Sequence, residues 1–210
     1  MLRGEGLSFR YGKQFPWLFR DLAIMVAPGE LVGLTAPSGR GKTTLARVLS
    51  GYLLRPTTGT ITVGGAPLPA RGYHPVQLIA QHPELAINPR WRIARVLAEG
   101  GPPSRAVLDA LQIDRAWLQR WPHELSGGEL QRIALARVLN PRTRYLIADE
   151  MTAMLDAATQ AQIWHAVHHF TAAHDIGVLV ISHDAALLAR LCARVERLPE
   201  DAAVVPSMQV

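Results

Sequence analysis

The amino-acid sequence predicts an α/β fold, in which a mainly parallel sheet is accompanied by an antiparallel β layer and a helical block. Short strand-and-turn patterns fill the chain to about Gly33. A helical pattern, punctuated by prolines and glycines, runs from Pro83 to about Val138. After it, apolar strands alternate with helices, and this alternation is typical of parallel sheets because parallel strands are usually joined by a crossing helix.

The chain has 210 residues, which suits one domain with its own core. We expect this single domain, residues 1–210, to divide into a core with its β layer over 1–81 and 139–210 and a helical subdomain over 82–138. Residues 57–65 are expected to form a strand that ends in a glycine turn, and the tail over 193–205 a last hairpin around Pro199-Glu200-Asp201.

A glycine-containing loop follows the first buried strand, residues 30–35, and precedes a helix over 44–49. Gly39 and Gly41 free the backbone to point successive N–H groups at phosphate oxygens. Lys42 would reach the β- and γ-phosphates of a nucleotide, and the Thr43 hydroxyl would bind Mg²⁺. Ala36 replaces the first glycine of the loop pattern, but the N–H donors lie downstream and we expect binding to survive. The candidate ATP-binding residues here are Ser38, Gly39, Arg40, Gly41, Lys42, Thr43 and Thr44.

Two carboxylates, Asp149 and Glu150, follow the apolar strand over 145–148. In open α/β sheets, ligands bind at the carboxyl ends of the strands. Asp149 would hold Mg²⁺ directly or through water, while Glu150 would orient and deprotonate an attacking water molecule. The alternative is that the acidic pair caps the helix that follows.

Residues 125–132 read Leu-Ser-Gly-Gly-Glu-Leu-Gln-Arg. Ser126 is a natural helix N-cap, and Gly127 and Gly128 let a ligand approach the backbone closely. A capped, glycine-bearing helix N-terminus is an anion site. Taken alone, Ser-Gly-Gly favours the alternative, an ordinary serine-capped helix.

The phosphate loop, this octapeptide and the acidic strand, in that order, resemble the motifs of ATP-binding-cassette (ABC) ATPases, and the resemblance covers about residues 2–205. It implies a P-loop (RecA-like) nucleotide-binding core that binds and hydrolyses ATP with Mg²⁺, and a helical subdomain that carries the octapeptide, the family's signature motif. It also implies a head-to-tail dimer, in which Lys42 of one subunit and Ser126, Gly127, Gly128 and Glu129 of the other enclose each ATP.

Further positions gain a role from the resemblance. Gln81, after the strand over 76–80, would sense Mg²⁺ and the attacking water. His183 would contact the γ-phosphate, and Tyr11 would stack on adenine. The alternatives are a surface glutamine, a histidine at a helix entry and a tyrosine packed in the core or a hairpin. Leu155-Asp156 resembles the loop that crosses the dimer interface, and Met151 stands where the family usually has proline.

The run from Gln81 to Ile93, QHPELAINPRWRI, resembles a segment of peptide- and nickel-importer ATPases. This implies integral-membrane transporter subunits as partners, a second ATPase subunit in a homo- or heterodimer, and a substrate-binding protein that acts indirectly. It also implies a peripheral location at the cytoplasmic face of the inner (cell) membrane. Trp91 and Ile93 are candidate anchors for a membrane-subunit helix, or else core residues. A haem exporter or a phosphonate-related ATPase remains an open alternative.

The charge of the chain could suggest a different partner. A formal net charge of +5 and a pI near 10.0 would suit nucleic acid. The basic residues are scattered, without a run of about 5–8, so no nucleic-acid partner is expected and a nucleic-acid-associated ABC ATPase is the lesser alternative. No apolar stretch approaches the roughly 20 residues of a membrane-spanning helix. Cys192 is expected to pack in the interior, and His165, His168 and His169 to lie on a solvated helix face.

Overall fold

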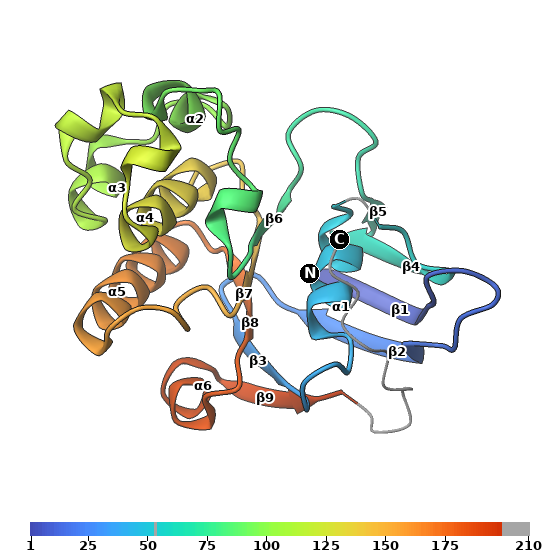
Figure 1. Ribbon diagram of the computed structural model, residues 1–210. Coiled ribbons are helices and arrows are strands. Elements are labelled where there is room, and N and C mark those ends of the chain that lie inside the picture. The colour runs from blue at the N-terminus through green and yellow to red at the C-terminus, as the bar shows by residue number, and fades with distance from the viewer. Residues whose placement is uncertain (53, 199–210) are drawn as a thin grey trace.

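The computed structural model describes residues 1–52 and 54–198, and this part of the chain forms two β-sheets (Figure 1). One sheet is antiparallel with the strand order β2-β1-β4-β5, and the other is parallel with the order β6-β7-β8-β3-β9. Their strands are β1 (Leu2–Phe9), β2 (Phe19–Val26), β3 (Leu31–Thr35), β4 (Thr58–Val63), β5 (Ala66–Pro67), β6 (Val76–Ile79), β7 (Tyr145–Asp149), β8 (Gly177–Ile181) and β9 (Arg194–Arg197).

The parallel sheet is buried on both faces, as its apolar strands require. Every residue of β7 and β8 is buried, and successive residues of a strand point to opposite faces. Leu146 and Ala148 therefore pack in one apolar cluster, whereas Tyr145 and Ile147 pack in the other. Nearly continuous apolar strands of this kind are typical of parallel sheets covered on both sides.

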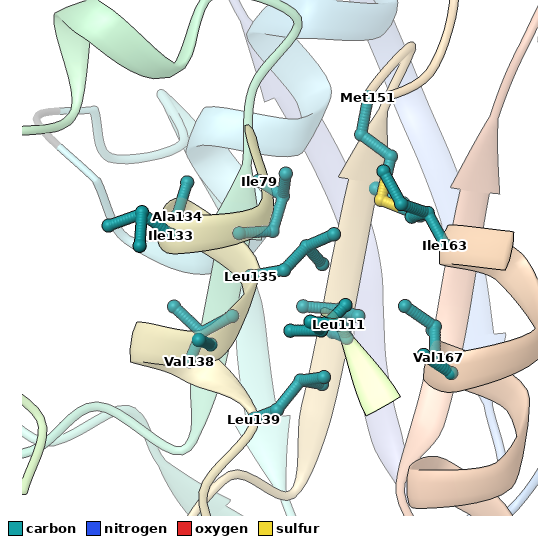
Figure 2. Packing of buried hydrophobic residues seen from close by; sticks show 14 of the residues in the cluster. Ile79, Leu111, Ile133, Ala134, Leu135, Val138, Leu139, Met151, Ile163 and Val167 are labelled. Atoms are coloured by element: carbon teal, nitrogen blue, oxygen red, sulfur yellow. The ribbon is translucent and has the colours of Figure 1, made fainter. Parts of the chain in front are cut away.

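The helices divide between the two faces. Helix α1 (Lys42–Ser50) packs in the same cluster as the antiparallel sheet. The opposite face is covered by α4 (Gly127–Val138) and α5 (Ala157–Ala173), whose buried residues belong to one cluster, part of which Figure 2 shows. The chain further contains α2 (Ile93–Ala98), α3 (Arg105–Ala110), α6 (Ala185–Leu191) and the 3₁₀ turns η1 (Pro83–Leu85), η2 (Arg115–Gln119) and η3 (Pro122–Glu124).

This arrangement confirms the predicted fold class. A core built on a parallel sheet lies beside an antiparallel layer. The octapeptide over 125–132 lies at the start of α4, in the helical block. Between residues 83 and 138 the secondary structure consists of helices and 3₁₀ turns. We retain the division of the chain at residues 82 and 138 as a proposal. Within the described residues, no helix is long and apolar enough to cross a membrane.

The C-terminal strand β9 joins the parallel sheet. It pairs in parallel with β3, with Arg194 opposite Val32. Helix α6 supplies the crossing connection between β8 and β9, which favours a parallel strand in the same sheet. The Arg194 guanidinium then bonds to Glu30 and to the Met25 carbonyl. The predicted turn around Pro199 lies outside the described residues.

The close approach of β4 to β1 gives a stability prediction. A Cβ added at Gly59 (φ +92) would lie 2.5 Å from the carbonyl oxygen of Gly6, whereas Gly72, at a similar φ of +88, has nothing within 4 Å. Both substitutions to alanine carry the cost of a left-handed backbone, but only Gly59→Ala adds a clash. We expect Gly59→Ala to lower the free energy of unfolding by roughly 1–3 kcal/mol more than Gly72→Ala in urea denaturation. Equal losses would contradict this strand register.

Candidate functional site

The candidate site lies where adjacent parallel strands end. The loop with Lys42 follows β3, Gln81 follows β6, Asp149 ends β7, and His183 follows β8. These strands are neighbours in the order β6-β7-β8-β3 and are parallel, so their carboxyl ends share one edge of the sheet. The sheet thus brings together residues that are more than a hundred positions apart in the sequence, for example Lys42 and His183.

The phosphate loop has the backbone that the glycines predict. Gly39 (φ 77) and Gly41 (φ 85) are left-handed, and Gly41 is the N-cap of α1 without a side-chain hydrogen bond. The first-turn N–H groups of α1 therefore remain available to an anion. A Cβ at Gly41 would lie 2.7 Å from Cγ of Leu18, a contact that the sequence did not reveal. Ser38 is exposed on this loop, and Arg40 is half-buried.

Ala36 is accommodated without strain in this loop. It is 4% exposed, and its φ is not in the left-handed region that would require glycine. Its carbonyl oxygen accepts a hydrogen bond of 2.9 Å from the Lys42 ammonium. The substitution for the first glycine of the pattern therefore leaves both the backbone and the interior packing intact.

Lys42 is a buried cation whose ammonium group finds hydrogen-bond acceptors in its own loop and in one residue distant in the sequence. It is 6% exposed, and its Nζ lies 2.9 Å from Nε2 of His183 and 3.4 Å from the carbonyl oxygen of Pro37. Burial lowers the pKa of Lys42, while the nearby charges of Glu150 and Asp149 raise it. Anionic phosphate oxygens would be stronger acceptors for this ammonium than the neutral carbonyls that hold it here.

Asp149 and Thr43 form an oxygen pair beside the loop. Asp149 is 4% exposed, and burial raises the pKa of its carboxyl, whereas a hydrogen bond from the Thr43 hydroxyl lowers it. A carboxylate and a hydroxyl are hard oxygen ligands of the kind that Mg²⁺ prefers, with the rest of its shell supplied by water and substrate phosphates. The described residues contain no cluster of three or more His, Cys, Asp or Glu side chains that could hold a metal alone. The pair therefore fits a Mg²⁺ ion bound together with a nucleotide.

Glu150 is held in an unusual backbone conformation. Its φ is +50, a left-handed value that costs a residue with a Cβ roughly 1–2 kcal/mol. Its backbone N–H donates to the carbonyl oxygen of Ile181 (3.0 Å), and its Oε1 lies 3.2 Å from Nε2 of His183. A neutral His183 that accepts from Lys42 at Nε2 cannot also donate from that nitrogen to Glu150. The imidazole thus lies between an ammonium and a carboxylate.

Two other predicted site residues, Gln81 and Tyr11, lie near the phosphate loop and the strand ends. Gln81 is half-buried two residues beyond β6, whose register with β7 places it at the same edge as Asp149. Tyr11 is 45% exposed, and its hydroxyl lies 2.8 Å from Oγ1 of Thr44 at the start of α1. An edge-on contact with Phe9 orients the Tyr11 ring. An exposed ring beside the phosphate loop is compatible with stacking on a base.

The octapeptide forms a capping box. Ser126 Oγ accepts from the Glu129 N–H (3.3 Å), and a Glu129 carboxylate oxygen accepts from the Ser126 N–H (2.7 Å). Gly127 is exposed, with nothing within 4 Å of an added Cβ, so a ligand can approach the helix end. Helix α4 covers one face of the parallel sheet and α1 the other (Figure 1). Within one protomer, Ser126 and Lys42 are therefore not brought together.

Other expectations from the sequence have mixed outcomes. Ile93 is 0% exposed, so of its two alternatives the core role is correct and the anchor role is wrong. Trp91 is half-buried under the Arg95 guanidinium. Cys192 packs against the core but is only partly buried, and desolvation raises the pKa of its thiol to about 11. The three helical histidines, His165, His168 and His169, are exposed as expected.

Comparisons with known proteins agree with this geometry. Residues 19–153 match the family model described as ABC transporter. The chain is 33% identical to a putative peptide import ATP-binding protein of Brucella ovis, over 93% of this chain and 68% of that protein. It is also 33% identical to the nickel import ATP-binding protein NikE of Rhodospirillum rubrum, over 86% of this chain and 72% of that protein.

Solved structures show the same fold. A dimeric ATP-binding cassette in a post-hydrolysis state with ADP and Pi superposes with a TM-score of 0.79 at 22% identity, over 94% of both chains. CbiO1 of Clostridium perfringens, part of the ABC transporter complex cbiONQ, superposes with a TM-score of 0.74, over 94% of this chain and 84% of that one. Together with the family match and the import relatives, the motifs place the chain in the ABC transporter family, as an ATP-binding and ATP-hydrolysing ABC ATPase.

Proposed function

We propose that this ABC ATPase powers an importer of peptides or nickel-type cargo, at the cytoplasmic face of the cell membrane. The observation that supports this choice most directly is the similarity to peptide and nickel import ATP-binding proteins over most of the chain. The run from Gln81 to Ile93 points to the same group. Integral-membrane subunits, a second ATPase subunit and, indirectly, a substrate-binding protein are the partners that such a system needs.

The loop residues bind the nucleotide phosphates in this proposal. Backbone N–H groups over 38–44 surround the phosphate oxygens at the positive end of α1. Lys42 exchanges its carbonyl acceptors for the β- and γ-phosphates, which neutralises charge where it develops during transfer. Thr43 and Asp149 would hold Mg²⁺, which supplies Lewis-acid stabilisation of the phosphate oxygens when bound. Tyr11 supports the adenine ring.

Three side chains act on water and the γ-phosphate. Glu150, the carboxylate directly after β7, orients the attacking water and accepts its proton. His183, already within 2.9 Å of the Lys42 ammonium, contacts the γ-phosphate when Lys42 turns towards it. Gln81 completes the site from β6 and responds to the positions of Mg²⁺ and water. Each group reaches this edge because its strand ends there.

The remaining part of the site comes from a second subunit. The open N-terminus of α4 can bind an anion, yet it lies across the sheet from Lys42 of its own protomer. A head-to-tail dimer resolves this separation, because Ser126, Gly127 and Gly128 of one subunit then close over the γ-phosphate bound by the other. The ATPase pair is a homodimer or a heterodimer with a sister subunit.

A groove beside the site suits a helix of the membrane subunit. It has a volume of about 690 Å³ and lies between the end of α1, β6 and the segment after Gln81. Leu85, in η1, lines it and is 70% exposed, which makes it a better anchor than the buried Ile93. Ala80 lines the groove and is followed directly by Gln81. A membrane-subunit helix bound in the groove can therefore influence Gln81 and, through it, the nucleotide site.

The first test of the site uses the only two lysines, Lys13 and Lys42. Lys42→Ala removes the ammonium that faces the phosphates, so we expect ATP hydrolysis by the purified complex to fall by at least about 100-fold. Lys13→Ala, at an exposed position, should leave it nearly unchanged, as should Ala36→Gly. Hydrolysis at a near wild-type rate by Lys42→Ala would rule out this assignment.

The dimer is tested by trapping it. Glu150→Gln keeps the shape of the side chain but cannot accept a proton, so ATP should bind and hydrolyse very slowly. Because bound ATP joins the two subunits, its affinity is linked to their association, and the variant should accumulate as an ATP-dependent dimer in size-exclusion chromatography. Adding Ser126→Arg should disperse the dimer while the monomer still binds ATP. A dimer that forms equally well without nucleotide would contradict closure by the signature.

The groove is tested at Leu85. Burying a leucine contributes about 1.5–3 kcal/mol, so Leu85→Ala should weaken association with the membrane subunits by about 10-fold or more and reduce their stimulation of the ATPase. Met25→Ala, at a 46% exposed residue on β2, is the matched control.

The nucleic-acid alternative has its own test. If DNA or RNA stimulates hydrolysis with a steep dependence on salt, that alternative is correct and the transport proposal is wrong.

A further inference from the structure

The loop between β7 and α5 joins the two halves of the proposed site. Glu150 begins this loop with its left-handed backbone. Near its other end, Cδ2 of Leu155 would lie 3.4 Å from a Cβ added at Gly128 of the signature. A shift of the loop would therefore move the carboxylate and also disturb the end of α4 that the partner subunit uses.

Apolar packing alone does not fix this loop. A cavity of about 260 Å³ separates it from the segment after β8 and is lined by Glu150, Leu155 and His183, among others. Met154 is 73% exposed, so it adds little packing within the protomer. Met151, where the resemblance leads us to expect proline, is buried and extends towards Ile163 (Figure 2). A methionine does not lock φ as a proline ring does.

A buried hydrogen-bond cluster holds the middle of the loop. Oγ1 of Thr152 accepts from Nε2 of Gln160 (2.9 Å) and from Nε1 of Trp164 (3.1 Å). A hydroxyl oxygen has two lone pairs, so both bonds can form together. Thr152 is 3% exposed and Trp164 is 5% exposed, so the bond between them is buried, whereas Gln160 is half-buried. The two donors lie four residues apart and therefore on one face of α5.

Helix α5 also contacts the signature helix directly. The Arg132 guanidinium on α4 donates to Oε1 of Gln162 at 3.2 Å. One helix thus holds the catalytic loop through Thr152 and the signature helix through Gln162. This shared support can keep Glu150 and Gly128 at a fixed spacing when the dimer closes.

We propose that Thr152, Gln160 and Trp164 form a positioning clamp that fixes the Glu150 carboxylate for water activation. Because Met151 does not lock the backbone φ as a proline ring would, the clamp supplies the restraint on this loop. It rests on the proposed role of Glu150 as the base. None of the three clamp residues touches the reacting atoms, so each acts through the loop and not as a catalytic residue.

A purely structural role makes a different prediction. A buried tryptophan N–H needs an acceptor in any protein, and its loss would lower stability and the fraction of active molecules. Hydrolysis per ATP-bound site would then stay constant. The clamp predicts the reverse, in which ATP binding persists and the turnover of each bound site falls.

The experiment uses the full chain in the complex with which it co-purifies. Thr152→Val keeps the shape of the side chain and removes the acceptor, while Thr152→Ser retains Oγ. Thr171→Val is the matched control, because Thr171 is also on α5, is 1% exposed and bonds to the His168 carbonyl far from the loop. For each variant, kcat per ATP-binding site, KM for ATP and the thermal midpoint are measured.

We expect Thr152→Val to lower kcat per site by about 10-fold or more, since a 1 Å misplacement can cost about 100-fold, with KM little changed. Thr152→Ser should restore most of the activity, and Thr171→Val should affect stability alone. Trp164→Phe should give a smaller loss in kcat, and it provides the decisive reading if Thr152→Val does not fold. An unchanged kcat per site in Thr152→Val, or in Trp164→Phe where only that variant folds, overturns the clamp.

Glu150→Gln, assayed in parallel, separates the clamp from the proposal on which it rests. If Glu150→Gln is inactive and Thr152→Val is fully active, only the clamp is wrong. If Glu150→Gln hydrolyses ATP at the wild-type rate, the assignment of the base is wrong, and the clamp with it.

Discussion

The parallel pairing of β6, β7, β8 and β3 is the constraint on which the rest of the structure depends. It places the ends of these strands at one edge, so that His183 contacts both Lys42 and Glu150, and Gln81 lies at the same edge. The same burial that stabilises the sheet desolvates Lys42 and Asp149, lowering the pKa of the first and raising that of the second. The proximity of Lys42 and Asp149 favours the charged form of each, whereas Glu150 raises the pKa of both and so favours the charged form of Lys42 alone. The side chains of the proposed site are therefore held in position by the fold itself.

Much of this site could be predicted from the sequence, because its signals are local. The glycines of the phosphate loop, the acids after an apolar strand and the serine cap of α4 each report a conformation within a few residues. The parts that could not be predicted depend on tertiary contacts. Periodicity gives no sign that Ile93 is in the core while Leu85 is exposed, or that β9 joins β3 in parallel. The Thr152 bonds join a loop to Gln160 and Trp164, which are 8 and 12 residues further along the chain. Threonine and glutamine also occur commonly at surfaces, so their presence alone does not predict these bonds.

The two departures from the family pattern have different physical consequences. Ala36 occupies a buried position with an ordinary backbone, so glycine is not required there and the Lys42 bond to its carbonyl is kept. Met151 fills the apolar cluster, but the loop after Glu150 then relies on hydrogen bonds to α5 for its shape. Ala36 therefore needs no compensation elsewhere in the structure. With Met151 in place of proline, hydrogen bonds to α5 restrain the loop after Glu150.

The central claim is that each ATP site is built from the strand ends of one subunit and the α4 N-terminus of another. Mixing two inactive variants, Lys42→Ala and Ser126→Arg, tests it most directly through single-turnover hydrolysis of bound ATP. In a mixed dimer, the intact Lys42 of one variant faces the intact Ser126 of the other, so one complete site forms and hydrolysis should return. If the variants associate and ATP stays unhydrolysed, Lys42 and Ser126 do not share a site across the dimer.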